Sequence, residues 1–138
     1  MILVDANILM YAAGADHPHK TPCLELLAGI AEGNVDAALD AEVLQEVLHR
    51  YRAIERWSAG ARVYDDARRI FSVVLPITVE TLDLARHLLD AHSAIGARDA
   101  LHAAVVESHQ LDGICSYDRG FDLIPGVARI EPAGLTTG

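Results

Sequence analysis

ILVDAN, at residues 2–7, is a short apolar run that ends at a carboxylate, and the same arrangement returns further along the chain. Ala37-Ala38-Leu39 is followed directly by Asp40, and the run at 113–116 leads to Asp118. Short apolar runs that end at polar residues are typical of buried strands. We therefore expect a strand at each of these three places.

Between these strands, apolar residues recur at the spacing of one helix face. Val43 and Val47 recur at the interval of one helix face, and Asp40 is well placed to cap that helix with its side-chain oxygen. Gly33-Asn34 ends the preceding helix, because both residues tolerate a left-handed backbone. We expect helices just after Asn7, at 20–32, 41–55, 61–73 and 78–92, and from Ala97, with Gly60 between the third and the fourth. Two further strands are expected near 73–77 and 127–130.

Strands that alternate with helices predict right-handed βαβ units and a parallel sheet covered on both faces. The expected fold class is therefore α/β, with three α/β/α layers around a central parallel sheet of about four to five strands. The chain has 138 residues, of which 51% are hydrophobic. That length and composition suit a single packed domain over residues 1–138.

The sequence also indicates a cellular compartment. No apolar run approaches the length of a membrane span, and no basic leader precedes the first strand. The two cysteines, Cys23 and Cys115, match no metal-binding spacing and are best interpreted as buried thiols. We therefore expect a soluble cytoplasmic protein that does not associate with a membrane.

Four acids fall where the predicted sheet would gather them. Asp5 and Asp118 come after strands, Asp99 opens a helix, and Glu46 lies about one turn into another helix. In open parallel sheets a ligand binds outside the carboxyl ends of the strands. Like charges gathered there repel each other unless a cation compensates them. The pattern therefore predicts a divalent metal site.

Simpler interpretations exist for each acid taken alone. An Asp at a strand end is often a cap or turn residue, which applies to Asp118 and Asp122 beside Gly120. Glu46 could pair with Arg50 one helical turn later. These interpretations must explain four coincidences at one sheet edge, so the metal site is the stronger hypothesis.

The histidines give a weaker signal. His102 lies three residues after Asp99 and could face the same site, although a packed or hydrogen-bonded helix histidine is the more common case. His17 and His19 could bind a soft metal, but a solvated turn is the better interpretation.

Arginine is concentrated in one part of this acidic chain. The net charge is −9, which argues against binding polyanions over the whole surface. Six of the eleven basic residues lie between 50 and 69, interleaved with aromatic residues; those nearest Glu46 are Arg50, Arg52 and Arg56. Such a strip suits single-stranded nucleic acid, and it equally suits a solvated helix pair in which arginines meet nearby acids.

In these motifs the chain resembles the PIN-domain nucleases, and within them the VapC-type toxins of type II toxin–antitoxin pairs. The resemblance spans nearly the whole chain and rests on four segments in the family's order: 4–7, 44–47, 97–101 and 116–122. Two departures are Asp40, where many relatives carry Ser or Thr, and Ser116, where Thr is common. The resemblance implies an endoribonuclease that depends on Mg²⁺ or Mn²⁺, and a PIN-like fold.

The resemblance also implies roles for individual residues. Asp5 and Asp99 would ligate the metal directly, while Glu46 and Asp118 would act through water on the ion. Attack by activated water on the RNA would leave a 5′-phosphate and a 3′-hydroxyl. Asn7 would orient Asp5 or a water, and Asp122 would be an outer member of the site. A VapB-type antitoxin, a homodimer and an RNA substrate are the partners that the resemblance implies; Arg50, Arg52 and Arg56 would meet RNA, the antitoxin or the dimer partner.

Three other functions stay open at this point. The chain could be a PIN nuclease of RNA processing or decay that is not a toxin, or an inactive PIN domain that only binds. A haloacid-dehalogenase-like phosphatase also begins with an Asp at a strand end, but it requires a second Asp where Asn7 stands.

Overall fold

Five parallel strands form the centre of the molecule. The computed structural model describes residues 1–136. The strands are β1 (Ile2–Val4), β2 (Ala37–Asp40), β3 (Val74–Leu75), β4 (Ile114–Cys115) and β5 (Arg129–Ile130). They pair in the order β3-β2-β1-β4-β5, and every pairing is parallel. This confirms the predicted parallel sheet.

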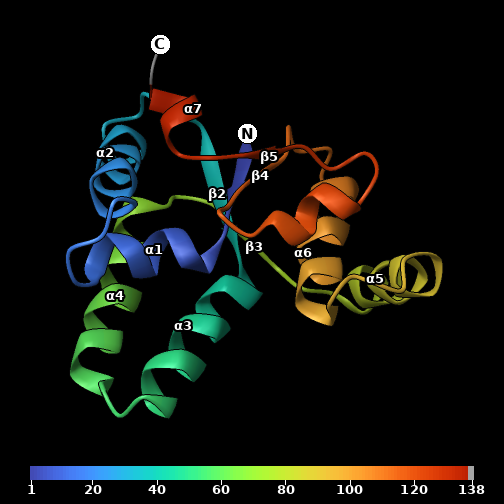
Figure 1. The fold of residues 1–138 in the computed structure, drawn as a ribbon, viewed down its shortest axis with the longest axis horizontal. Helices are drawn as coiled ribbons and strands as arrows, with labels where there is room; N and C mark the ends of the chain where they lie inside the picture. The colour runs from blue at the N-terminus through green and yellow to red at the C-terminus, as the bar shows by residue number, and fades with distance from the viewer. Residues whose placement is uncertain (137–138) are drawn as a thin grey trace.

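Helices cover both faces of the sheet, which completes the three α/β/α layers (Figure 1). The helices are α1 (Ala6–Ala13), α2 (Lys20–Ala31), α3 (Ala41–Ala53), α4 (Trp57–Ile70), α5 (Val79–Ala91), α6 (Ala97–Ser108) and the short α7 (Ala133–Thr136), with a 3-10 turn η1 at Arg119–Leu123. In β1, Ile2 and Val4 pack with α1 to α4, whereas Leu3 packs with α5 and α6. Alternate strand residues point to opposite faces, so this short apolar strand is buried on both sides.

The chain reverses its direction across the sheet beside β1. It runs from β1 through β2 to the edge strand β3, and then crosses back to β4 on the other side of β1. The helices of the first two crossovers cover one face, and α5 and α6 of the return cover the other (Figure 1). Right-handed crossovers require this change of face. The carboxyl ends of β1 and β4 are therefore the switch point where ligands bind in such sheets.

The boundary between α3 and α4 differs from the prediction. The break falls at 54–56, where Glu55 has a left-handed backbone with φ of 57°, and Gly60 lies inside α4. A Cβ at Gly60 would lie 2.4 Å from the Cβ of Tyr51 on α3. Gly60 therefore allows the two helices to approach closely, and it does not separate them. A glycine required by such a contact resembles a helix breaker when only the sequence is considered.

The expected roles of Asp40 and Gly33 at helix ends are confirmed. The Asp40 side chain accepts from the Val43 amide at 2.9 Å and caps α3, and Gly33 lies just after α2 with φ of +80°. Both cysteines are free and buried. Within residues 1–136, no helix is long and apolar enough to cross a membrane. The single-domain prediction for 1–138 stays a prediction, and residues 137–138 lie outside the described part.

Candidate metal centre and nucleic-acid interface

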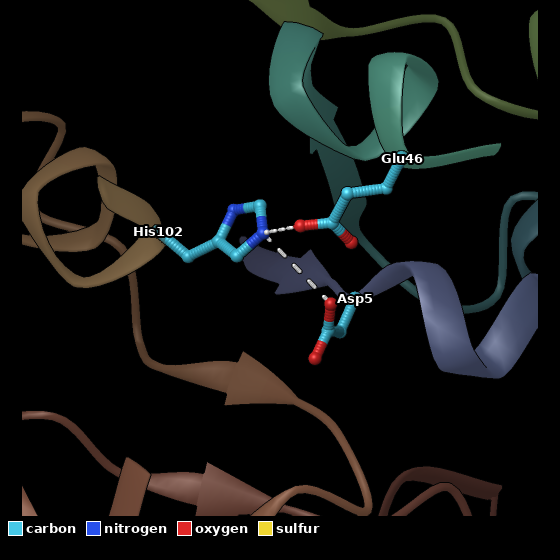
Figure 2. A group of neighbouring side chains, drawn as sticks. All are labelled: Asp5, Glu46 and His102. Atoms are coloured by element: carbon cyan, nitrogen blue, oxygen red, sulfur yellow. Dashed lines mark hydrogen bonds and ion pairs between the residues drawn. The ribbon is translucent and has the colours of Figure 1, made fainter. Parts of the chain in front are cut away.

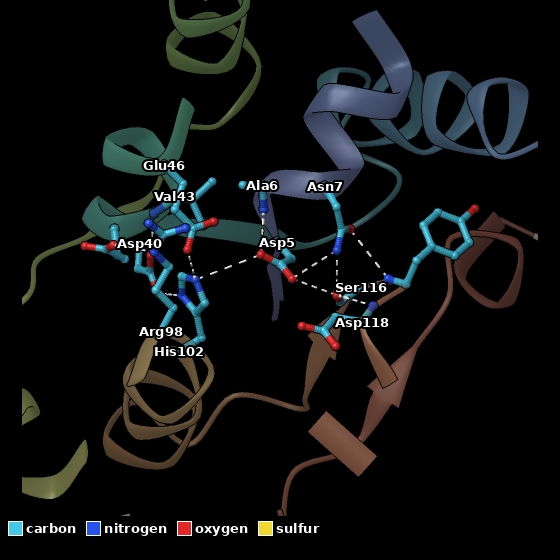
Figure 3. Close-up of polar contacts among 12 residues, drawn as sticks. Asp5, Ala6, Asn7, Asp40, Val43, Glu46, Arg98, His102, Ser116 and Asp118 are labelled. Carbon is cyan, nitrogen blue, oxygen red and sulfur yellow. Dashed lines mark hydrogen bonds and ion pairs between the residues drawn. The ribbon is translucent and has the colours of Figure 1, made fainter. Parts of the chain in front are cut away.

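Asp5 lies at the end of β1 and caps α1. Its carboxylate is almost fully buried, with 6% of the residue exposed. Oδ1 accepts from the Ala6 amide at 2.7 Å, and Oδ2 accepts from the Ser116 hydroxyl at 2.7 Å (Figure 3). Burial raises the pKa of Asp5, while nearby His102 and the Ser116 hydrogen bond act to lower it. The donors fix both carboxylate oxygens in position.

Ser116, at the end of β4, connects three parts of the site. Its Oγ accepts from Asn7 Nδ2 at 3.0 Å and from the Asp118 amide at 2.9 Å, while it donates to Asp5. Asn7 Nδ2 also lies 3.3 Å from Asp5 Oδ2. The hydroxyl therefore links the β1 and β4 ends of the switch point (Figure 3).

Glu46 points from α3 toward His102 of α6, which lies beside Asp5 (Figure 2). His102 Nε2 is 3.0 Å from Glu46 Oε1 and 3.9 Å from Asp5 Oδ1. Its other ring nitrogen, Nδ1, is 2.6 Å from Oδ2 of Asp40, which is also buried. Burial would lower the pKa of His102, but hydrogen bonds with Asp40 and then Glu46 raise it well above the usual 6.5. The imidazole thus contacts Asp40 through one ring nitrogen and Glu46 through the other, and the raised pKa favours its protonated form.

Asp99 and Asp118 form the opposite side of the site. Burial, the charges of Asp118 and Asp5 and a hydrogen bond with Asp118 raise the pKa of Asp99 to about 6. Asp118 also accepts from the Gly120 amide at 2.8 Å, so it starts η1 as a turn residue would. A Cβ at Gly120 would lie 2.8 Å from Asp99 Oδ2 and 3.1 Å from Asp118 Oδ1. The missing side chain of Gly120 therefore leaves room for both carboxylates.

One pocket of about 420 Å³ lies over these groups and is named the acid pocket. The acidic residues that line it are Asp5, Glu46, Asp99 and Asp118. The structure thus brings all four predicted acids to one place. Arg50, Arg98 and His49 also line the pocket, so its rim is cationic. The sequence predicts Arg50 as a contact residue, but it does not predict Arg98 or His49 at this pocket.

Comparisons with known proteins decide the family. A family model described as the PIN domain matches residues 2–127. The chain belongs to the PIN-domain family. A VapC ribonuclease of Mycobacterium bovis and ribonuclease VapC13 of Mycobacterium tuberculosis are each 45% identical to it over 130 residues, which is 94% of this chain and 99% of theirs. Ribonuclease VapC7 of Mycobacterium tuberculosis is 35% identical, over 99% of this chain and 97% of its own.

Solved structures share the PIN fold. The crystal structure of Mycobacterium tuberculosis VapC20, described as a Sarcin-Ricin loop cleaving toxin, has a TM-score of 0.77 at 18% identity and covers 96% of this chain and 100% of its own. FitAcB from Neisseria gonorrhoeae has a TM-score of 0.73 at 20% identity, over 98% of this chain and 100% of its own. The predicted resemblance to VapC-type PIN proteins and the predicted fold class are confirmed.

The donor set of this PIN domain suits a hard divalent cation. The acid pocket offers carboxylate oxygens, which Mg²⁺ and Mn²⁺ prefer. Carboxylate oxygens of Asp5 and Glu46 lie within 4.8 Å of each other, and a ring nitrogen of His102 lies within the same distance of both. Burial and then the charges of Asp118 and Asp5 raise the pKa of Asp99 to about 6, and a bound cation would offset this repulsion between carboxylates. The residues present therefore fit such an ion.

The other residues predicted for the site or for RNA contact lie in different places. Asp122 is not in the lining of the acid pocket, and its carboxylate accepts from Arg129 Nε at 3.0 Å. Arg52 lies over the ring of Trp57, with 4.4 Å from its Cζ to the ring centroid. Arg56 lines a neighbouring pocket together with Arg50. Of the three predicted contact arginines, only Arg50 borders the acids.

Two supporting residues of the PIN site were weakly signalled in the sequence. His102 was noted for its spacing from Asp99, and the structure shows it both buried and hydrogen-bonded to Glu46. Ser116 was noted only as a substitute for Thr, although its hydroxyl organises the site. Their partners lie far away in the sequence, so spacing alone could not assign these contacts.

Proposed function

We propose that this chain is a metal-dependent endoribonuclease that cuts single-stranded RNA and acts as the toxin of a type II toxin–antitoxin pair. The observation that carries the proposal is the acid pocket, in which four carboxylates from four separate segments converge. The relatives with 45% identity are named VapC ribonucleases, which supports the same reaction class. The alternatives, a PIN nuclease of RNA maturation and an inactive binding module, have no observation that favours them.

Asp5 and Asp99 are the residues that would hold the ion directly, with Glu46 and Asp118 contributing through water. A bound Mg²⁺ or Mn²⁺ would supply a water of lowered pKa and would stabilise the charge that develops on the scissile phosphate. This assignment uses the positions of the side chains around the pocket. It also uses the preference of Mg²⁺ for a small number of carboxylates.

The protein's own groups prepare the pocket for this ion. Ser116 and the Ala6 amide hold the carboxylate of Asp5 in one orientation. His102 holds Glu46 through Nε2 while Asp40 fixes the ring through Nδ1. Such outer hydrogen bonds orient the groups around a metal and tune their basicity. Asp99, whose pKa is raised to about 6, would have to be deprotonated to bind the ion.

The cationic rim would meet the substrate. Arg50 and Arg98 line the pocket that contains the acids, so their guanidinium groups could contact phosphate oxygens on either side of the cut. A VapB-type antitoxin, a homodimer and a cytoplasmic location complete the proposal. Among proteins with a similar fold, one solved assembly is described as a toxin–antitoxin complex from Klebsiella pneumoniae.

RNA cleavage by the purified protein tests the proposal. We expect wild type to cut RNA with Mg²⁺ or Mn²⁺ and to stop with EDTA. Asp5→Asn and Asp99→Asn should lose at least about a hundredfold in rate, since each removes a carboxylate from the metal centre. Asp122→Asn is the matched control, because this acid contacts Arg129 outside the pocket. Cleavage that persists in EDTA, or equal cleavage by the Asp5 and Asp99 variants, would contradict the proposal.

The toxin role has its own test. A neighbouring open reading frame should encode a small DNA-binding protein. That protein should copurify with this chain and suppress its cleavage of RNA. Expression of wild type without that neighbour should arrest growth, and expression of Asp5→Asn should not. Growth that is equal with both forms would leave a nuclease that is not a toxin.

A further inference from the structure

A second pocket adjoins the acid pocket and is named the arginine pocket. It has a volume of about 680 Å³ and lies between α1 and the ends of α3 and α4. Asn7, Met10 and Arg50 line both pockets, so the two form one continuous depression. Whatever binds at the acids can therefore extend into the arginine pocket.

The two pockets have opposite charge. Arg50 and Arg56 are the charged residues in the lining of the arginine pocket, and no acid lines it. Both arginines are exposed, and neither forms an ion pair with any residue in 1–136. Their charges are therefore free to contact an anionic ligand, although the whole chain carries a net charge of −9. Exposed arginines without an acidic partner beside an apolar wall suit a phosphate that carries a base.

One wall of the arginine pocket includes a tyrosine that packs against other aromatic rings. Tyr11 lies in this wall, and its ring centroid is 4.7 Å from that of His17, 5.0 Å from that of His19 and 5.5 Å from that of Tyr117. The rings of His19 and Tyr117 stack at 3.6 Å. A side chain that is packed before binding loses less conformational entropy when a ligand binds. The ring contacts therefore favour Tyr11 as part of a preformed wall.

We propose that the arginine pocket binds the nucleotide next to the scissile phosphate, with Arg50 and Arg56 on phosphate oxygens of the RNA strand. This inference rests on the proposed function, which places the scissile phosphate in the acid pocket. Arg50 lines both pockets and so contacts the strand where it passes from one to the other. The site recognises the backbone and an exposed base of an unpaired strand, as single-strand binding sites do.

Salt-dependent binding of labelled RNA tests the inference without requiring cleavage. The probes are fluorescein-labelled oligo(U) and oligo(A) of about eight nucleotides, a length typical of single-strand sites. Fluorescence anisotropy is recorded in EDTA between about 50 and about 200 mM salt, the range over which released counterions dominate. Wild type is compared with Arg50→Gln, Arg56→Gln and the control Arg68→Gln, which removes the same charge from an exposed position of α4 outside both pockets.

We expect Arg56→Gln and Arg50→Gln each to weaken binding about tenfold, the usual effect of losing a charge-assisted hydrogen bond. Each should lower the slope of log Kd against log salt by about 0.7, the value for one phosphate contact on a single strand. Arg68→Gln should match wild type in both quantities. Unchanged slopes for the Arg50 and Arg56 variants, equal losses in all three variants, or no binding by wild type would overturn the inference.

Failure of the inference can be distinguished from failure of the proposed function. Wild type that binds through Arg50 and Arg56 but cuts nothing would contradict the nuclease, and would leave a single-strand binding site at the two arginines without a cleavage site beside it. Wild type that cuts RNA while both variants bind it normally would overturn the nucleotide site alone. Variants that bind RNA normally but lose a coexpressed antitoxin would assign the pocket to a protein partner, which also overturns the inference.

Discussion

His102 Nδ1 lies 2.6 Å from Oδ2 of Asp40, and both side chains are almost completely buried, at 1% and 0% exposure of the residue. Asp40 also caps α3, and His102 also holds Glu46. The pair therefore connects the start of α3 and the core with the acid pocket that Glu46 lines. Asp40 has two partners in this chain, because one of its oxygens accepts from the Val43 amide and the other contacts the imidazole.

Removal of this imidazole should destabilise the protein. In His102→Ala, Asp40 keeps its buried charge without its partner, and breaking such a pair costs about 3–5 kcal/mol. Urea unfolding of metal-free protein at neutral pH measures this loss. His87→Ala, on the exposed side of α5, is the matched control and should change stability by less than about 0.5 kcal/mol. Equal stability of the two variants would contradict the buried contact.

The stabilisation by His102 should depend on pH in a defined direction. Its pKa is raised in the folded state above the usual 6.5, so the folded protein holds this proton more tightly than the unfolded chain. The contribution is then fully present below about pH 6.5 and is lost as the pH rises through the higher folded value. The stability difference between wild type and His102→Ala should therefore shrink at alkaline pH. A difference that grows with rising pH would show the opposite linkage.

Metal affinity should rise with pH through the titration of Asp99. The pKa of this carboxyl is raised to about 6, and a metal ligand must be deprotonated. Calorimetric titration with Mn²⁺ should show affinity that increases as the pH rises to about 6 and then levels off. Asp99→Asn should bind more weakly and lose this dependence, whereas Asp122→Asn should retain it. A wild-type affinity that does not change with pH up to about 6 would contradict the raised pKa of Asp99.

Gly120 should matter for the site more than for folding. An added Cβ would lie 2.8 Å from Asp99 Oδ2, and this flexible carboxylate can move aside. Gly120→Ala should therefore weaken Mn²⁺ binding about tenfold while the melting temperature changes little, since misplaced support around a metal costs about 10–100-fold in affinity. Gly96→Ala is the control, because a Cβ added at Gly96 would have no neighbouring atom within 4 Å. A large drop in melting temperature without a change in metal binding would contradict this role.

Gly60 should matter for folding and not for the site. An added Cβ would lie 2.4 Å from Tyr51 Cβ, so α3 and α4 would have to separate. We expect Gly60→Ala to lose about 1–3 kcal/mol of stability despite the better helix propensity of Ala. Tyr51→Ala should cost less in the Gly60→Ala background than in wild type, which a double-mutant cycle by urea unfolding measures. Additive losses would contradict the contact.

The sequence predicts most of the fold because the fold depends on local signals. The apolar runs that end at Asp5, Asp40 and Asp118 mark strand ends, and the parallel sheet brings these ends to one edge. Gly60 misled the prediction because its cause is a contact with another helix. The short α7 was not predicted at all, since four residues carry too little periodicity to recognise.

The candidate site was also only partly predictable from the sequence. The four acids could be predicted, because each lies after a strand or near the start of a helix at the same sheet edge. The hydrogen bonds from Ser116 to Asp5 and from His102 to Asp40 could not, because they join residues 111 and 62 positions apart. The separation of Arg50 from Arg52 also depends on the helix face that each occupies, which the composition of the strip does not show.

Anomalous diffraction from a crystal of the wild-type protein grown with Mn²⁺ tests the metal centre most directly. We predict a Mn²⁺ peak in the acid pocket with carboxylate oxygens of Asp5 and Asp99 as direct ligands, at metal–oxygen distances of about 2.0–2.3 Å. The peak should vanish in Asp5→Asn. A crystal with a Mn²⁺ peak only elsewhere, such as at His17 and His19, or with no peak in the acid pocket at saturating Mn²⁺, would contradict the assignment.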